Sequence, residues 1–285
     1  MNFSKYIGGI TNICCTCPSE IIFTGREEFI LECVSIVLKL GHFINNPRIT
    51  VISKDTDGIK TKIHSIFQYH DWMKREPLLT IQYFDFSNLK TLQQHFHPIN
   101  MKVEGIVLLS DRTGGFENLA IQIPAATNYE ESTLSNGTKD LITIAQLLFQ
   151  EKNPINKMSW DELPYLYKEQ YIYQAAHHLI KISILGYTVN INNSTAANNS
   201  TCWSQIYKIV NRNLETLSEL EHNRWWAIML GNGYQFGYKR DIILKTHPDM
   251  KPYSELDETT KQKDRDMILN CLSLFQKIGL LPLPK

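Results

Sequence analysis

The residues best suited to bind a small anionic ligand gather in the last third of the sequence. They combine flat aromatic rings with cationic or hydrogen-bonding groups, and they comprise Arg224, Trp225, Tyr234, Lys245, His247, Tyr253 and Lys263. Aromatic rings stack on planar groups such as nucleobases, whereas guanidinium and ammonium groups bind phosphate. The set therefore predicts a site for a nucleotide-like ligand.

A helix expected over residues 214–230 positions the first two of these side chains. Leu214, Leu217, Glu221 and Ile228 recur at helical spacing on one stripe. Arg224 follows Glu221 by three residues, so this acid competes for its charge. Taken one at a time, the tryptophans and the arginine of this helix are explained by a packed core with a satisfied salt bridge. The conjunction with the loop that follows Lys245 favours a binding site, because binding residues concentrate on loops held by a rigid scaffold.

The sequence carries no motif of a known catalytic class. Gly-x-Ser-x-Gly, His-Glu-x-x-His and a Walker loop are all absent from it. Cys14 and Cys17 form a Cys-x-x-Cys pair, but the chain offers no second ligand pair at zinc-finger spacing. The adjacent His177 and His178 point about 100° apart on a helix, which predicts one surface and one core position. We expect a non-enzymatic protein without a metal or cofactor.

The N-terminal half alternates short β-rich runs with helical runs. The expected strands cover residues 20–24, 48–53, 78–84, 104–110 and 141–145, and the expected helices cover 27–40, 58–69, 88–96 and 117–123. Alternation at this spacing predicts an α/β domain with a Rossmann-like parallel sheet and helices on both faces.

The start of this half has the outline of a dinucleotide-binding unit. A strand leads into Gly25 and a helix, and a second strand is followed by Asp55. Gly25 is the only glycine of the usual three, since Glu27 and Phe29 occupy the positions that follow. Glu27 adds bulk and negative charge where backbone normally approaches the pyrophosphate. The sequence therefore disfavours NAD(P) binding in the usual pose.

Over about residues 18 to 125 this half resembles the Rossmann-type regulatory domain of Trk potassium-uptake regulators, in a divergent form found in some bacterial two-domain proteins. The resemblance rests on Thr24-Gly25, Gly41-His42-Phe43, residues 49–55, Phe84-Asp85, residues 108–111 and Asn118-Leu119. It implies that Gly25 lies at the diphosphate and Asp55 at the ribose. Without the other glycines, the scaffold would serve docking or dimerisation.

Beyond residue 150 the β pattern fades and helices are expected over 160–187, 214–230 and 259–278. These helices are expected to end at glycines, namely Gly186, Gly231 and Gly279. Residues 190–201 form a polar loop or linker. A shift of 93 residues places Trp160-Asp-Glu-Leu163 on Tyr253-Ser-Glu-Leu256 and Gly186 on Gly279. An internal duplication or shared capping rules would both give this match. We expect residues 160–187 to pack with the C-terminal module that contains the helices over 214–230 and 259–278. Residues 160–187 resemble the last of these helices in sequence.

Several separated motifs of this half occur in the order found in one family. They are Glu221-His-x-x-Trp225, Gly233-Tyr-x-x-Gly237, His247-Pro-x-x-x-Pro-Tyr253-x-x-Leu256 and Lys261-x-x-Asp-Arg265. Over about residues 203 to 280 the chain resembles the ryanodine receptor repeat (RyR) domain, a small helical module that bacteria also carry. The expected organisation is a tail over 1–17, a Rossmann-like domain over 18–150 and a helical domain over 151–285.

Composition excludes several other classes of function. The chain has 29 basic and 29 acidic residues, so no global field attracts a nucleic-acid duplex or an anionic membrane, and only a local basic patch could still do so. Its apolar runs are far shorter than the roughly 20 residues of a membrane span, and its first residues lack a signal-peptide core. We expect a cytoplasmic regulatory protein that senses a nucleotide-like small molecule. The alternatives are an interaction scaffold, with a protein partner or a second copy docked on it, and an unusual NAD(P)-binding enzyme.

Overall fold

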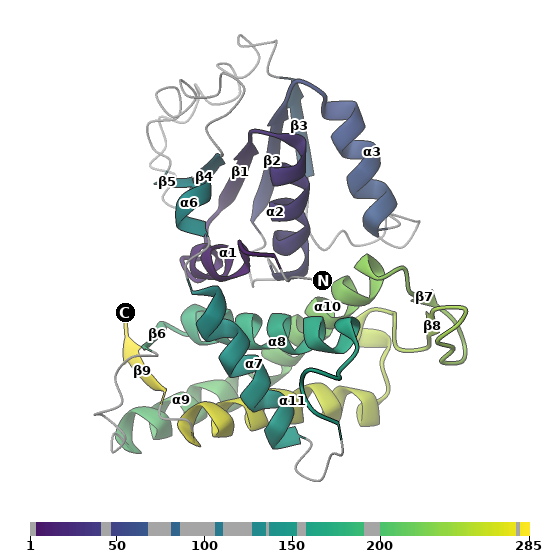
Figure 1. Cartoon of the computed structure of the whole chain (residues 1–285). Coiled ribbons are helices and arrows are strands. Elements are labelled where there is room, and N and C mark those ends of the chain that lie inside the picture. Colours follow the sequence, from purple (N-terminus) through teal and green to yellow (C-terminus); the bar gives the residue numbers. More distant parts are fainter. Residues whose placement is uncertain are drawn as a thin grey trace. The chain divides into compact units, whose positions relative to one another are not determined.

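The protein, seen here as a computed structural model (Figure 1), consists of two compact units, residues 2–138 and 139–285. The structure describes residues 4–40, 47–67, 81–85, 106–110, 127–134, 137–152, 158–190, 200–277 and 280–285. The first unit is a mixed α/β unit and the second is mainly helical. The division falls between Thr138 and Lys139, twelve residues before the boundary near 150 that the sequence suggests.

The first unit is built on a parallel sheet. Its five strands are β1 (Glu20–Thr24), β2 (Arg48–Ser53), β3 (Ile81–Asp85), β4 (Ile106–Ser110) and β5 (Thr127–Glu130), in the order β3-β2-β1-β4-β5. Every neighbouring pair is parallel. In the centre, Phe23 of β1 pairs with Val51 of β2 and Leu109 of β4. All residues of β1 are buried, as expected for a central strand covered on both faces.

Helices α2 (Glu27–Leu40) and α3 (Thr56–Phe67) cover one face of this sheet. Both contact the strands, and they contact each other, so they lie on the same side. The helices expected over 88–96 and 117–123, which would cover the other face, lie outside the described residues. The expected tail over residues 1–17 instead contains α1 (Ile7–Cys14), which packs on α2 and on α6 (Glu131–Leu134). Ile7, Ile10 and Ile13 recur at helical spacing and bury that helix.

The strand expected over residues 141–145 is wrong. These residues lie in helix α7 (Thr138–Lys152), and β5 is the outer strand instead. The β-branched residues from Ile142 to Ile144 have the composition that is typical of a strand. Leu141, Ile144 and Leu148, however, are buried at a spacing of three and four residues, which is the period of a helix.

In the second unit, α10 packs against both α8 and α11. Its elements are α7, α8 (Tyr165–Ile184), β6 (Tyr187–Asn190), α9 (Ser200–Arg212), α10 (Leu214–Gly231), β7 (Gln235–Phe236), β8 (Thr246–His247), the short 3-10 helix η3 (Tyr253–Glu255), α11 (Glu258–Lys277) and β9 (Leu281–Pro284). The three expected long helices are confirmed as α8, α10 and α11, with shifted ends. The contact of α8 with α10 also confirms that residues 160–187 pack with the C-terminal module.

The shift of 93 residues seen in the sequence also relates elements of the structure. It carries Tyr165 and Ile184, the ends of α8, onto Glu258 and Lys277, the ends of α11. Strands β6 and β9, which follow these two helices, pair with each other in antiparallel fashion. The stop after α8 is Gly186, at φ 87°, a conformation that favours glycine. After α10, the glycine with positive φ is Gly233 and not the expected Gly231.

Candidate functional site

A cavity of about 230 Å³ lies in the second unit between α8, α10 and the segment that follows α10. We call it the aromatic cavity. Its lining consists of Leu166, Tyr167, Gln170, Trp225, Met229, Tyr234, Arg240 and His247. Three of the residues predicted from the sequence, Trp225, Tyr234 and His247, thus come together in one place.

The local fold explains why these three rings converge. Trp225 lies on α10, and Tyr234 follows directly after the turn at Gly233 that ends this helix. His247 belongs to β8, which pairs in parallel with β7. This pairing needs Gly237, because a Cβ there would lie 2.6 Å from the side chain of Thr246. The ring centroids of Trp225 and His247 are 5.0 Å apart, in an edge-on arrangement.

His247 is arranged as a neutral hydrogen-bond donor. Its Nδ1 accepts a bond from the backbone N–H of Asp249 at 3.2 Å, so in the neutral ring the proton is on Nε2. Burial lowers the pKa of His247, with the Asp249 carboxylate opposing and the charges of Arg240 and Lys263 assisting. Two cations therefore act at this end of the cavity. Of the two, Arg240 lines it and Lys263 is an exposed residue of α11.

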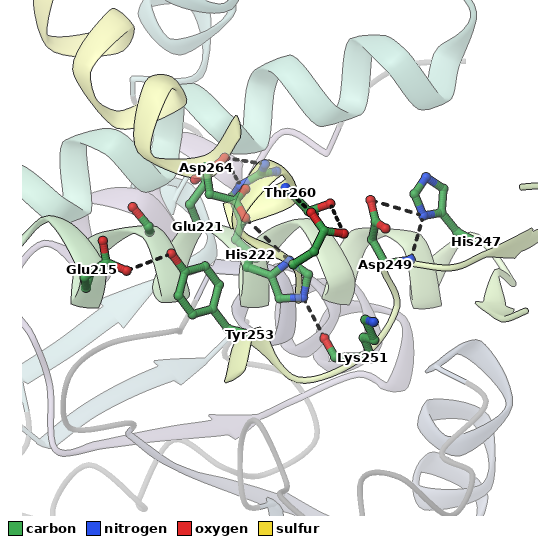
Figure 2. A network of polar contacts seen from close by, with 12 residues as sticks. Glu215, Glu221, His222, His247, Asp249, Lys251, Tyr253, Thr260 and Asp264 are labelled. Atoms are coloured by element: carbon green, nitrogen blue, oxygen red, sulfur yellow. Dashed lines mark hydrogen bonds and ion pairs between the residues drawn. The ribbon is translucent and has the colours of Figure 1, made fainter. Parts of the chain in front are cut away.

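Trp225 contacts the ring of His222, which belongs to a network of polar contacts (Figure 2). His222 Nε2 donates to the backbone carbonyl of Lys251 at 2.8 Å, and its Nδ1 lies 3.7 Å from Asp264 Oδ2. The ring of His222 contacts the rings of Trp225 and Tyr253, with centroids 5.6 Å and 6.0 Å away. Burial raises the pKa of the Asp264 carboxyl to about 7, and the nearby charge of Glu221 adds to the effect.

Two of the predicted site residues have structural contacts away from the cavity lining. Tyr253 is buried, and its hydroxyl donates to Glu215 Oε2 at 3.3 Å. Lys261 places its ammonium 5.5 Å from the centre of the Tyr253 ring. Lys245 is exposed, and its Nζ donates to the backbone carbonyl of Asn232 at 2.9 Å.

Arg224 is not among the lining residues. It is 3% exposed and donates to Glu221 Oε1 from Nη2 at 2.6 Å and from Nε at 3.1 Å. Lys181 of α8 donates to the other oxygen of Glu221 at 2.5 Å. Nη1 of Arg224 has no hydrogen-bond partner among the described residues. The competition by Glu221 expected from the sequence is therefore present, and this charge is held inside the helical unit.

Glu221, Arg224, Lys181 and His177 form a cluster that we call the buried ion cluster. Burial alone raises the pKa of Glu221, but the charges of Arg224 and Lys181 more than offset this and hold that pKa well below its usual value. His177 Nδ1 lies 3.7 Å from Glu221 Oε2. Burial, and then the charge of Lys181, lower the pKa of His177 to about 4. At neutral pH one carboxylate thus holds two cations beside a neutral histidine.

The expectation of one surface and one core histidine at 177 and 178 is wrong, because His177 is 0% and His178 4% exposed. Their helix α8 packs against α10, and its residues Tyr171 and His178 contact rings of α7 and α11, so its buried residues occupy more than one face. A buried central helix has no single apolar face that a sequence pattern could reveal.

In the first unit, the residues expected at a dinucleotide are Gly25 and Asp55, and Asp55 already makes a local contact. Gly25 follows β1 at φ 129°. Oδ1 of Asp55 accepts the backbone N–H of Gly58 at 2.9 Å and so caps the first turn of α3. Glu27, at the start of α2, forms an ion pair with Lys62 of α3. A carboxylate used as a helix cap and an acid at the α2 terminus are both unfavourable for a dinucleotide there.

We predict that the full chain does not bind NAD or NADP with micromolar affinity. The Glu27 carboxylate stands where a pyrophosphate would approach the N-terminus of α2, and two like charges at short range repel. Isothermal titration calorimetry with each dinucleotide measures this directly. A dissociation constant in the micromolar range or below would contradict it.

Neither unit offers a metal centre in its described part: there, no three His, Cys, Asp or Glu side chains are close enough together to hold a metal ion. None of the helices in the described ranges combines the length and the hydropathy that a bilayer-spanning helix needs.

Comparison with protein families finds a match that covers part of the aromatic cavity. Residues 200–281 match the family model of the RyR domain. The match runs from α9 through α11 to the first residue of β9, so the C-terminal part of this chain is similar to the RyR domain. Of the cavity lining, Trp225, Met229, Tyr234, Arg240 and His247 lie inside the matched range. Leu166, Tyr167 and Gln170 come from α8, which precedes it.

Sequence reasoning missed the α8 side of the cavity and Arg240. Tyr167 and Gln170 are separated from Trp225 by more than fifty residues, and no spacing rule joins them. The repeat could have pointed to α8, since it relates this helix to α11 of the module. Arg240 could have been found as a further cation on the loop that carries Lys245.

The buried titratable groups predict that the protein is more stable at pH 6.5 than at pH 5. The folded-state pKa of His177, about 4, lies below the usual histidine value of 6.5, so the unfolded state binds the extra proton and stability rises with pH in this window. The lowered pKa values of His178, His222 and His247 act in the same direction. Asp264 opposes them, because its raised pKa makes the folded state bind a proton between pH 3.8 and about 7.

Urea denaturation followed by circular dichroism at the two pH values measures this difference. The Asp264→Asn variant should show a larger gain between pH 5 and 6.5 than the wild type, because the opposing contribution is gone. A wild-type midpoint that stays constant or falls over this range would contradict the prediction.

Proposed function

We propose that the C-terminal unit binds a nucleotide-like ligand in the aromatic cavity and that the protein is a non-enzymatic sensor of this ligand. The observation that carries the proposal is the convergence of Trp225, Tyr234 and His247 on one cavity with Arg240. Aromatic faces and a guanidinium are the groups that bind a base and a phosphate. A cation that is not already held by a buried acid is available to a ligand, which favours Arg240 over Arg224 for this role.

The size of the cavity suits part of a nucleotide. Its volume of about 230 Å³ is below the about 300 to 1,000 Å³ of cavities that enclose drug-sized ligands. In our proposal a planar base lies against Trp225, and Nε2–H of His247 donates to it. The phosphate extends toward Arg240, with Lys263 adding positive potential. Tyr167, 39% exposed, stands at the rim and can cover the other face of the base.

For the first unit we propose a Rossmann-type scaffold, akin to the Trk regulatory domain, that no longer binds a dinucleotide. The strand order β3-β2-β1-β4-β5 supports this, because it is the order of the first five strands of dinucleotide-binding sheets. The helix-capping role of Asp55 and the Glu27–Lys62 pair support the loss of the ligand. The scaffold would then serve docking or dimerisation, and the protein would act in the cytoplasm.

Thermal-shift measurements on the full chain test the ligand proposal. The panel comprises mononucleotides, dinucleotides and cyclic oligonucleotides, with inorganic phosphate as the control for charge alone. A ligand present at 100 times its dissociation constant adds about 2.7 kcal/mol to the stability. We expect at least one nucleotide, and not phosphate, to raise the melting temperature. If no member of the panel does so, the alternative of an interaction scaffold gains. If only NAD(P) does so, the alternative of an unusual NAD(P) enzyme gains.

A further inference from the structure

The loop between β7 and β8 exposes large apolar side chains to solvent. Tyr238 is 92% exposed, Ile243 91%, and Ile242 and Leu244 are each 67% exposed. We call these four residues the apolar tip. In Figure 1 this loop extends away from the helices of the second unit. Isoleucine and leucine are among the residues most often buried, so adjacent exposed ones indicate a surface that something else covers.

The tip is held in one conformation by hydrogen bonds of its own loop. Oδ1 of Asp241 accepts the backbone N–H groups of Ile243 and Leu244, each at 2.8 Å. Asp241 and Thr246 also exchange two backbone hydrogen bonds, at 3.0 Å and 2.9 Å. Thr246 Oγ1 donates to the carbonyl of Lys239 at 2.9 Å. The apolar side chains are therefore presented by an ordered turn.

Cations flank the aliphatic residues of the tip on both sides. Lys239 and Arg240 lie between Tyr238 and Ile242, Lys245 follows Leu244, and all three are exposed. The one acid among residues 236–247 is Asp241, whose carboxylate already accepts two backbone hydrogen bonds. The loop thus combines an apolar centre with a positive border, although the chain as a whole has no net charge.

We propose that this loop docks the protein on an anionic lipid bilayer. Ile242, Ile243 and Leu244 enter the boundary between headgroups and acyl chains, with Tyr238 at headgroup level. The flanking cations contact lipid phosphates. Burial of apolar area and attraction to anionic lipid are the two contributions that hold a peripheral protein at a membrane. The helices described in this chain offer no span, so such contact is peripheral.

The charge pattern favours lipid over a protein surface. A stable protein interface has an apolar core depleted of charge and a polar rim of mixed sign. Here the border carries cations, and its one acid is already hydrogen-bonded, which is complementary to a continuous sheet of anionic headgroups. The proposal does not depend on a ligand in the aromatic cavity.

Vesicle co-sedimentation of the full chain tests the proposal. We expect binding to phosphatidylcholine vesicles that contain phosphatidylserine, and at least tenfold weaker binding to pure phosphatidylcholine or at high salt, because the cations supply part of the attraction. The double variant Ile242→Ser/Ile243→Ser should lose about tenfold or more of the binding at unchanged charge. Met158→Ser removes an apolar side chain that is 44% exposed outside the loop, and should bind as the wild type does.

A second variant keeps the proposal testable if the serine variant folds poorly. In Ile243→Trp, insertion should shift the added tryptophan emission to the blue when anionic vesicles are present. Equal binding to neutral and anionic vesicles, or binding that the serine variant retains, would overturn the proposal. So would a wild-type dimer in sedimentation velocity that the serine variant converts to a monomer without any vesicle binding, since the tip would then join two copies.

Discussion

Replacing Glu221 with alanine should lower the free energy of unfolding by about 3 to 5 kcal/mol, because Lys181 and Arg224 would be left as buried charges without a partner. Both cations are at most 3% exposed, and their ammonium and guanidinium groups bond to the two oxygens of this one carboxylate. Glu221→Gln keeps the shape of the side chain but removes its charge, so it should also destabilise the protein. Urea denaturation followed by circular dichroism gives the free energies.

Glu219→Ala is the matched control for this experiment. Glu219 lies on the same helix, two residues away, and is exposed. Its removal should change the stability by no more than about 0.5 kcal/mol, as is usual for surface positions. A Glu221→Ala protein as stable as this control would show that the buried ion cluster does not hold α8 and α10 together.

Replacing Trp225 with alanine should weaken nucleotide binding by about 5- to 150-fold, which corresponds to the about 1 to 3 kcal/mol of a base stacked on an aromatic ring. Trp225 lines the aromatic cavity, and its partly exposed ring is positioned by His222 and His247. The affinity is measured by calorimetry with the nucleotide that gives the largest thermal shift. Circular dichroism of the free variant shows whether the fold is retained.

Tyr165→Ala provides the control for the loss of an aromatic ring. Tyr165 is 40% exposed at the start of α8, two residues from Tyr167, and it does not line the cavity. Its variant should bind with wild-type affinity. Equal weakening in both variants would indicate that the loss reflects α8 stability and not stacking. Unchanged affinity of Trp225→Ala would place the base elsewhere.

The regular part of the fold follows from local sequence patterns. Strands β1 and β2 and helix α2 coincide with their expected ranges, since the strands are short β-rich runs and the helix has a helical period. The fifth strand was misplaced because a β-branched run inside α7 has both a strand-like composition and a helical period. Local preference was overridden there by burial of Leu141 and Leu148 on one side of the helix.

The candidate site was predictable only in part. Trp225, Tyr234 and His247 are joined by sequence order within one module, so their residue types and spacing identified them. The pairing of Arg224 with Glu221 follows from their spacing, but Lys181, whose helix precedes the module, supplies a second cation to Glu221 that no spacing reveals. The contribution of Tyr167 likewise depends on how α8 packs on α10. Contacts between distant helices leave no local signal in a single sequence.

Hydrogen–deuterium exchange of the full chain, with and without the nucleotide that gives the largest thermal shift, locates the ligand site. Exchange of backbone amides reports local opening, which a bound ligand suppresses where it binds. The aromatic cavity predicts protection in peptides that cover residues 165–170, 225–234 and 239–247. Protection confined to residues 20–67, or exchange that no nucleotide in the panel changes, would contradict the claim that this cavity is the ligand site.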